Sequence, residues 1–468
     1  MEKKSIKIID LKKSEFDEFV KKGGIQLREA CLIPIIKPGD EAALASVILS
    51  SIRLIKEFRR MVLSDVKIMK GGHILVYNEV VFSQFPNSRI DGLLLIVRGD
   101  TIKDAAIFEM KNGTNDLDQE QIERYQKIAK AYNIPKLITV SNQFVSEPTQ
   151  CPVNIKPLKQ VELYHFSWSY LLTLAHILLF DNELNIKDKN QVEIMREVVN
   201  YLESDKSGVC GFRQMKQGWK DVVEKINSGT RLKTSDTDLY DSVISWQQEE
   251  KDLALILSRS LGVFVNSGEA KYRGNLKARI DDDKEKLIRK SLLTSNLRVK
   301  GAVSDIKIEA LFKRKVIEMF VTLKAPQDKK LKGQLNWIKR QLDNCRKKNK
   351  ETFKKIQNEI LIEIILKNTN RTERVSIDTI DNIYDEIKDR EIKEFRILYI
   401  KDFSKKFSNC RNFVKIIEDM LISYYSGVIQ YLSKWAEPAP KMIDSGEENI
   451  AEVNTEKSDT DNIKNTEV

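Results

Sequence analysis

Two apolar segments, residues 90–97 and 105–111, flank an Arg-Gly-Asp sequence at residues 98–100, and this arrangement restricts the local fold more than any other feature of the chain. Both segments are rich in Val, Ile, Leu and Phe, which is typical of β-strands, and Gly with Asp between them is typical of a turn. We therefore predict a hairpin centred on the turn. In that register Asp91 lies opposite Glu109, with Cβ atoms about 5 Å apart.

Lys111 completes a cluster of charges at the end of this hairpin. Glu109 and Lys111 are two residues apart on a strand, so their side chains point to the same face. Adjacent carboxylates raise each other's pKa unless a cation lies between them, and carboxylate oxygens suit Mg²⁺ or Mn²⁺. Asp91, Glu109 and Lys111 thus predict a metal site for phosphodiester hydrolysis, in which the lysine stabilises developing charge.

The Glu-x-Lys pattern is weak evidence by itself, because it occurs six times in the chain. Only the triplet at Glu109 ends an apolar strand, has an aspartate at the matching distance upstream, and precedes a helix with suitably spaced polar groups. On that helix Gln121 and Tyr125 lie four residues apart, so both side chains can reach the same place. The context, rather than the triplet, supports the prediction.

A helical pattern precedes the hairpin. Apolar residues recur at intervals of three and four over residues 41–62, which predicts one helix of about six turns, with Asp40 as its N-cap. Glu41 lies at the start of the apolar stripe and adds a third carboxylate. Further patterns predict strands at 74–82 and 135–140, helices at 115–132, 169–179 and 192–202, and hence an order α-β-β-β-α-β over the first six elements.

These residues, in this order of elements, resemble the PD-(D/E)XK nuclease superfamily. The Gln121-x-x-x-Tyr125 motif is similar to that of its RecB-like and lambda-exonuclease-like branch. The resemblance covers about residues 38–179, with Ile90 where the name of the family has Pro. It implies a restriction-endonuclease-like α/β core and a hydrolase that cuts DNA, with RNA left open, in bacterial defence or DNA processing.

The resemblance also implies roles for individual residues. Glu41, Asp91 and Glu109 would bind Mg²⁺ (or Mn²⁺), and Lys111 would assist the nucleophilic water. Gln121 and Tyr125 match the accessory catalytic motif.

Simpler readings of the same residues stay open. Asp91 could begin a turn, and Glu109 with Lys111 could form an ion pair on a solvated strand. Glu41 could favour the positive end of the helix dipole beside Asp40. The chain would then be a catalytically silent nucleic-acid-binding protein on the same fold.

Length and charge predict the wider organisation of the 468-residue chain. We expect a lead-in at 1–30, the nuclease-like domain at 31–205, a connecting segment at 206–233, an α+β domain at 234–436 and a disordered acidic tail at 437–468. The net charge is +10 and the tail carries nine acids and three lysines, so the remaining chain carries +16. A basic body favours nucleic acid as a partner.

One segment of the second half is especially basic. Residues 329–355 hold eleven Lys or Arg and two acids, and an apolar stripe from Leu331 to Cys345 predicts a helix. We expect this helix to expose six cations for phosphate contacts: Lys332, Lys339, Arg340, Arg346, Lys347 and Lys348. The alternatives are a solvated helix and a surface that docks an acidic protein partner.

Other features predict the environment of the protein. Five scattered cysteines without a Cys-x-x-Cys pair predict neither disulfides nor a zinc site. The longest mostly apolar run, residues 170–180, is about half of a ~20-residue membrane span. We therefore expect a cytoplasmic protein without a membrane partner. The sequence does not indicate the oligomeric state or any companion proteins.

Overall fold

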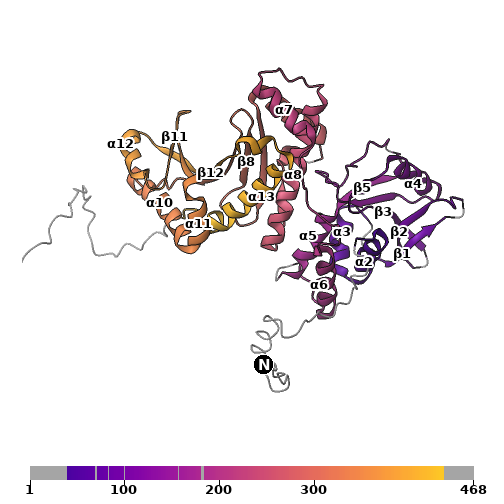
Figure 1. Ribbon diagram of the computed structural model, residues 1–468. Helices are drawn as coiled ribbons and strands as arrows, with labels where there is room; N and C mark the ends of the chain where they lie inside the picture. The colour runs from indigo at the N-terminus through magenta and orange to yellow at the C-terminus, as the bar shows by residue number, and fades with distance from the viewer. Residues whose placement is uncertain are drawn as a thin grey trace, which may run out of the picture.

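The computed structural model describes residues 39–436, apart from residues 69–70, 83, 100, 157, 181–183 and 273. The protein is of the mixed α/β class and contains a five-stranded and a seven-stranded sheet, which lie towards opposite ends of the molecule in Figure 1. The predicted lead-in at 1–30 and the predicted acidic tail at 437–468 lie outside the described residues.

The first sheet has the strand order β1-β2-β3-β4-β5. Its strands are β1 (His73–Val81), β2 (Arg89–Arg98), β3 (Thr101–Met110), β4 (Lys136–Ser141) and β5 (Glu162–Ser167). The pairs β1–β2 and β2–β3 are antiparallel, whereas β3–β4 and β4–β5 are parallel. The carboxyl ends of β3, β4 and β5 therefore meet at one edge, the usual place for a functional site in such sheets.

Helices cover both faces of this sheet. They are α2 (Glu41–Leu54), α3 (Lys56–Ser64), α4 (Gln119–Ala131), α5 (Trp168–Leu179) and α6 (Lys189–Glu203). One apolar core joins α2, α3, α5 and α6 to the sheet, and α4 packs on the other face through a second core. The predicted α-β-β-β-α-β order of elements is confirmed, with the first helix divided and with β5 as a strand that the sequence patterns did not predict.

The single helix predicted over residues 41–62 is wrong, because the chain leaves the helical conformation at Ile55, where φ is −102° and ψ is 107°. The Ile55 side chain is fully buried by this break. Arg59 on α3 compensates for the missing helical hydrogen bonds, since its guanidinium donates to the main-chain oxygens of Ile52 and Arg53 at 3.3 and 2.8 Å. The predicted N-cap is confirmed, with Asp40 accepting a bond from Ala42 N at 3.0 Å.

The helix predicted at 115–132 begins later, at Gln119. Asp118 caps it by accepting a 2.7 Å hydrogen bond from Gln121 N. Asn115 instead belongs to the loop that follows β3. This later start matters for the site described below, because the loop carries Asn112 and Asn115 to the first turn of α2.

The second sheet is antiparallel throughout and has the order β11-β10-β12-β9-β8-β7-β6. Its strands are β6 (Val265–Ser267), β7 (Leu292–Val299), β8 (Ile306–Leu311), β9 (Val316–Lys324), β10 (Ile360–Leu366), β11 (Thr372–Val375) and β12 (Ile392–Asp402). In β8 and β10, apolar side chains at every second position point into one core.

Helices and short 3₁₀ turns surround the second sheet. The α-helices are α7 (Gln217–Asn227), α8 (Thr237–Leu261), α9 (Leu276–Lys290), α10 (Leu331–Lys348), α11 (Lys350–Ile356), α12 (Tyr384–Ile387) and α13 (Cys410–Gly427). The 3₁₀ turns are η1 (Ala270–Tyr272), η2 (Gln357–Glu359), η3 (Ile380–Ile383), η4 (Ser404–Ser408) and η5 (Ile429–Tyr431).

The long helix α8 connects the two halves of the molecule (Figure 1). It packs on α5, which is apolar on all sides because it lies between its own sheet and α8. Polar groups fix this packing: Asp252 on α8 accepts hydrogen bonds from Ser169 Oγ at 3.1 Å and from Phe212 N at 2.7 Å. The first sheet and the second half are thus joined by a buried, hydrogen-bonded interface.

Candidate active site

The hairpin of β2 and β3 has the predicted register. The partners run from Gly92 with Phe108 to Ile96 with Asp104, and the register shifts only beyond Ile96, beside the turn. Continuing this register by one residue places Asp91 opposite Glu109. Asp91 Oδ2 also accepts a 2.6 Å hydrogen bond from Met110 N, which holds the aspartate against the end of β3.

The Lys111 ammonium lies between two carboxylates. Its Nζ is 2.8 Å from Glu109 Oε1 and 3.7 Å from Glu41 Oε2. The lysine main chain is anchored on both sides, because Lys111 N donates to Val140 O and Trp168 Nε1 donates to Lys111 O, each at 2.8 Å. The predicted convergence of two acids and a lysine is therefore present in the structure.

Glu109 is the most deeply buried member of the cluster, with 1% of its surface exposed. Among the described residues, neither carboxylate oxygen has a well-directed hydrogen-bond donor, although Lys111 Nζ is close to Oε1. Burial and the neighbouring charge of Asp91 raise the pKa of Glu109 to about 8. Burial also raises the pKa of Asp91, against the effect of Met110 N–H. Both carboxyls therefore favour their protonated form more than an exposed carboxyl does.

The pKa of Lys111 is raised, although burial alone would lower it. Burial lowers it, but the ion pair with Glu109, and the charges of Glu41 and Asp91, outweigh that effect and raise it. Lys111 is therefore a cation at neutral pH, as a group that stabilises a developing negative charge must be.

Gln121 and Tyr125 lie on one face of α4, as predicted. Gln121 Nε2 donates to the Tyr125 hydroxyl at 3.0 Å, and that hydroxyl donates to the main-chain oxygen of Arg89 at 2.6 Å. Arg89 is two residues before Asp91. The motif therefore connects α4 to the start of the strand that carries the aspartate.

Glu41 holds the loop after β3. Its Oε1 accepts hydrogen bonds from Asn112 N at 3.2 Å and from Asn115 Nδ2 at 2.8 Å. Only Oε2 is directed towards Lys111. The helix dipole at the start of α2 also favours this carboxylate. Glu41 thus positions the loop after β3 through Oε1, and its Oε2 lies 3.7 Å from Lys111 Nζ.

A cleft of about 410 Å³ brings these side chains together. Glu41, Asp91, Lys111, Gln121 and Tyr125 line it; Glu109 does not line it, but its Oε1 lies 2.8 Å from Lys111 Nζ. The start of α2 adds Asp40, Ala42 and Ala45 to the wall. The sequence patterns did not indicate the part of the wall that comes from the β1–β2 hairpin and α4: Asn78, Glu79, Asn87, Ser88, Arg89 and Arg124. Helical spacing could have predicted Arg124, because a residue three positions after Gln121 lies on the same face of the helix.

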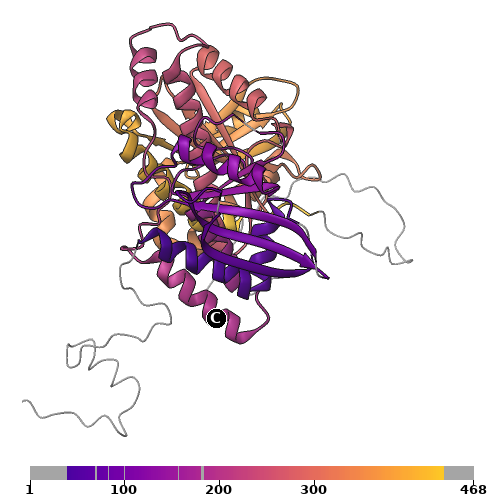
Figure 2. The ribbon, with the colours of Figure 1, turned by 90° about the vertical axis from the view of Figure 1, so that its right-hand side faces the viewer.

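The basic helix α10 differs in part from its prediction. Lys332, Arg340, Lys347 and Lys348 are exposed. Lys339 instead forms a close ion pair with Asp381, and Arg346 lies 3.5 Å from Asp378 and 3.9 Å from Asp343. In addition, Figure 1 shows α10 on the opposite side of the molecule from β2, β3 and α4, which supply residues of the cleft, and in Figure 2 the first sheet lies in front of the second half. Two of the six predicted cations are thus neutralised.

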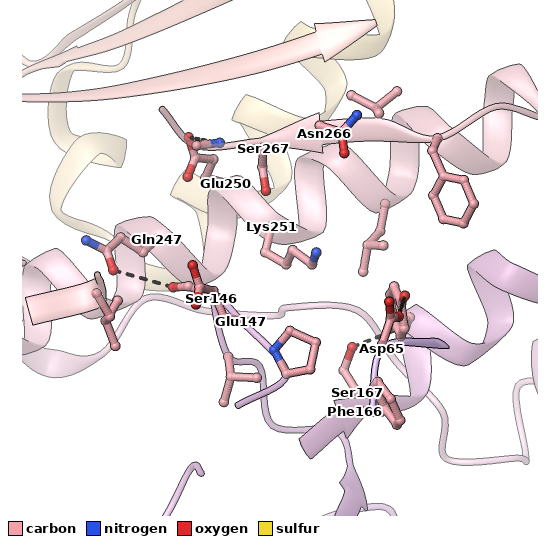
Figure 3. Close-up of a pocket in the computed structure, with 18 of the residues that line it drawn as sticks. Asp65, Ser146, Glu147, Phe166, Ser167, Gln247, Glu250, Lys251, Asn266 and Ser267 are labelled. Atoms are coloured by element: carbon pink, nitrogen blue, oxygen red, sulfur yellow. Dashed lines mark hydrogen bonds between the residues drawn. The ribbon is translucent and has the colours of Figure 1, made fainter. Parts of the chain in front are cut away.

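A second cleft, of about 420 Å³, lies between the two halves of the molecule (Figure 3). None of the predicted catalytic residues lines it. Its acids are already engaged: Asp65 accepts from the Tyr170 hydroxyl, and Glu250 from Gly268 N and Asn296 N. Lys251 Nζ lies 5.5 Å from the Tyr170 ring centroid. The lining of this cleft carries four acids and three Lys or Arg side chains. The cleft at Asp91 and Lys111 contains the predicted catalytic residues, so it is the better candidate.

Neither a ready-made metal cage nor a known family identifies the site. In the part of the chain that the structure describes, no group of three or more His, Cys, Asp or Glu side chains is placed to hold a metal ion, and no helix is both long and apolar enough to cross a membrane. No protein-family model matches the chain, and no curated protein matches it. The site must therefore be judged on its own geometry.

Proposed function

We propose that the protein is a metal-dependent nuclease with a restriction-endonuclease-like core of the PD-(D/E)XK type. The observation that carries the proposal is the pairing of Asp91 and Glu109 on adjacent strands, with the Lys111 ammonium 2.8 Å from Glu109. The Gln-x-x-x-Tyr face of α4 opens into the same cleft. The β2–β3 hairpin and α4 thus together supply the residue types that phosphodiester hydrolysis needs.

The residues fit a divalent cation. Glu109 has two buried oxygens without a well-directed donor, and its pKa is raised to about 8 by burial and by Asp91. A bound cation would contact the buried oxygens of Glu109 and would offset the repulsion between Glu109 and Asp91. Asp91 and Glu109 would hold the metal, whereas Glu41 Oε2 is directed towards Lys111 in this structure. Because the protein supplies so few ligands, water and substrate phosphate would complete the shell, as is usual for Mg²⁺.

Each residue then has a distinct task. A bound Mg²⁺ (or Mn²⁺) would acidify a water molecule and neutralise charge on the phosphate. Lys111 orients the water and stabilises the negative charge that develops on the phosphate. Tyr125 and Gln121 fix the start of β2 and hence Asp91. Glu41 fixes the loop after β3 through Asn112 and Asn115.

DNA is the proposed substrate, because the resemblance and the charge of the chain both favour it. A role in bacterial defence or DNA processing follows from the resemblance alone. The competing function is a catalytically silent nucleic-acid-binding protein, in which the Glu109–Lys111 ion pair would be only structural. The two functions make different predictions for metal uptake and for cutting.

The test compares wild type, Asp91→Asn and Lys111→Met on supercoiled, linear and single-stranded DNA and on RNA, each with Mg²⁺, Mn²⁺ or EDTA. We expect cutting by wild type with metal only. Lys111→Met should still bind Mn²⁺. Its cutting rate should fall by about a hundredfold or more, because removing one group that stabilises charge in the transition state typically has an effect of that size. Asp91→Asn should lose both Mn²⁺ binding and cutting.

Lys393→Met is the matched control, since Lys393 closes another Glu-x-Lys triplet, is exposed and lies in the second sheet. It should cut like wild type. Metal-dependent cutting that persists in Lys111→Met would reject the assignment of the site. If wild type takes up no metal and cuts no substrate, the silent binding protein is the better description.

A further inference from the structure

Two short segments far apart in the sequence form a basic surface that the sequence patterns did not predict. Residues 213–220 contain three Lys or Arg and residues 404–415 contain four, and neither segment contains an acid. We call these seven side chains the basic ridge: Arg213, Lys216, Lys220, Lys405, Lys406, Arg411 and Lys415. All seven are exposed.

Packing holds the two segments side by side. Trp219 Nε1 donates to Phe407 O at 2.7 Å, and Met215 N donates to Cys410 O at 3.1 Å. The Trp219 ring also packs on Phe413, with centroids 4.6 Å apart. Because the apolar residues of both segments point into this core, the charged residues between them point out. The ridge therefore lies on rigid elements, the start of α7 on one side and η4 with the start of α13 on the other.

The charge of the ridge is mostly not neutralised. Lys216 pairs with Asp241 at 3.3 Å and Lys220 with Glu224 at 3.8 Å, yet their side chains stay 45% and 49% exposed. For the other five cations no ion-pair partner occurs among the residues that the structure describes. Such a concentration of unbalanced positive charge attracts a polyanion. On α10, Lys339 and Arg346 are likewise paired with acids, and the other four predicted cations are exposed, so the ridge differs from α10 chiefly in its position relative to the site.

The ridge is connected to the candidate active site by a short stretch of chain. Two asparagines bind this stretch to the loops at the ends of β3 and β4. Asn112 Nδ2 donates to Ser207 O at 2.6 Å, and Asn142 Nδ2 donates to Gly208 O at 2.8 Å. Cys210 N in turn donates to Asn142 Oδ1 at 3.1 Å.

Arg213 begins the ridge three residues after Cys210, which is at most roughly 11 Å of extended chain. Asn112 is the residue after Lys111. The ridge therefore starts near the edge of the first sheet at which the candidate active site lies.

We infer that the basic ridge binds the phosphate backbone of the nucleic-acid substrate and leads it to the cleft at Asp91 and Lys111. The inference rests on the proposed function for its substrate class. Phosphate binding by Lys and Arg of this kind gives affinity without sequence information, and it makes binding sensitive to salt. The ridge, rather than α10, is the main phosphate-binding surface, because it combines unpaired charge with a connection to the site.

The test measures the affinity of fluorescent duplex DNA, single-stranded DNA and RNA by anisotropy in EDTA, which prevents metal-dependent cutting, over a range of salt concentrations. The ridge variant is Lys405→Ser/Lys406→Ser/Arg411→Ser. We expect at least about tenfold weaker binding. The slope of log affinity against log salt should fall by about 0.9 for each duplex phosphate that the variant no longer neutralises, or by about 0.7 for a single strand.

The matched control is Lys332→Ser/Lys347→Ser/Lys348→Ser on α10, which removes the same charge from exposed positions. Its affinity should change by less than about threefold. Equal losses of affinity in both variants, or a ridge variant that binds like wild type, would overturn the inference. So would a ridge variant that keeps nucleic-acid binding and loses binding to polyglutamate, because the ridge would then dock an acidic protein.

Binding and cutting separate this inference from the proposed function. Because the binding assay needs no metal, it tests the ridge even if the protein cuts nothing. If the protein does cut, the ridge variant should show a higher KM with a kcat close to that of wild type, since no ridge residue lines the cleft. A large loss of kcat at an unchanged KM would contradict the inference.

Discussion

The side-chain amide of Asn112 donates a 2.6 Å hydrogen bond to the main-chain oxygen of Ser207, which lies 95 residues further along the chain. Ser207 is fully buried and Asn112 is 4% exposed, so water cannot replace this bond. The residue that follows the proposed catalytic lysine is thereby tied to the segment that leads into the second half of the protein.

Replacing Asn112 tests this tie. Asn112→Ala leaves the oxygens of Ser207 and Gly39 without their donor, and we expect a loss of about 1–3 kcal/mol in the free energy of unfolding, because an unsatisfied buried acceptor costs about that much. Urea unfolding followed by circular dichroism measures it. Asn115→Ala, which removes an exposed hydrogen bond to Glu41, should cost about 0.5 kcal/mol or less. Similar losses of stability in both variants would contradict the prediction.

The Tyr125 hydroxyl should matter for both stability and rate. Tyr125→Phe removes the 2.6 Å bond to Arg89 O, and we expect a cost of about 1 kcal/mol together with about a tenfold slower cutting rate, since the start of β2 then positions Asp91 less well. Thermal unfolding and initial rates measure the two effects. Tyr132→Phe, at the end of the same helix, is the control and should change neither.

Stability should fall in mild acid because of His165. Burial lowers the pKa of His165 to about 4 from the ordinary value of about 6.5. Between these values the unfolded chain binds more protons than the folded one, so stability decreases as the pH falls from about 6.5 to 4. The loss of stability attributable to His165 is about 3 kcal/mol. Unfolding measured at several pH values should show a shallower decrease for His165→Gln; an unchanged profile would refute the prediction.

Glu249 should have the opposite effect on the pH dependence. It is fully buried on α8, neither of its oxygens has a hydrogen-bond partner among the described residues, and burial with the charges of Glu418 and Asp252 raises its pKa well above the ordinary 4.5. The folded state then binds the extra proton, so stability is lost as the pH rises above about 4.5.

Glu249→Gln removes this titration. We expect the variant to be more stable than wild type at pH 8 by at least about 1 kcal/mol, with the difference vanishing near pH 4. The exposed Glu224→Gln on α7 serves as the control and should follow the wild-type profile. A difference that does not grow with pH would argue against a buried, proton-binding Glu249.

Metal binding offers a test that is independent of substrate. A cation that binds only the folded state stabilises it by about 2.7 kcal/mol at a hundred times its dissociation constant. Mn²⁺ should therefore raise the unfolding temperature of wild type and of Lys393→Met, whereas Asp91→Asn should show little change. An equal rise in all three proteins would show that the metal binds elsewhere.

The sequence alone determined the features that depend on neighbouring residues. The turn at residues 98–100 between two apolar segments predicted the register that sets Asp91 against Glu109, the i, i+4 spacing put Gln121 beside Tyr125, and Asp40 identified the first turn of α2. Strand periodicity, helix periodicity and capping act over a few residues, so a linear pattern contains the information.

Only the tertiary structure decided the relations between distant segments. It broke the first helix at Ile55 to bury that side chain, neutralised Lys339 with Asp381, and paired Trp219 with Phe407, 188 residues away. These outcomes depend on which surfaces the whole chain must bury and which charges then meet. Local preferences are small beside those long-range packing and electrostatic energies, so no local pattern could have indicated the basic ridge or its connection to the site.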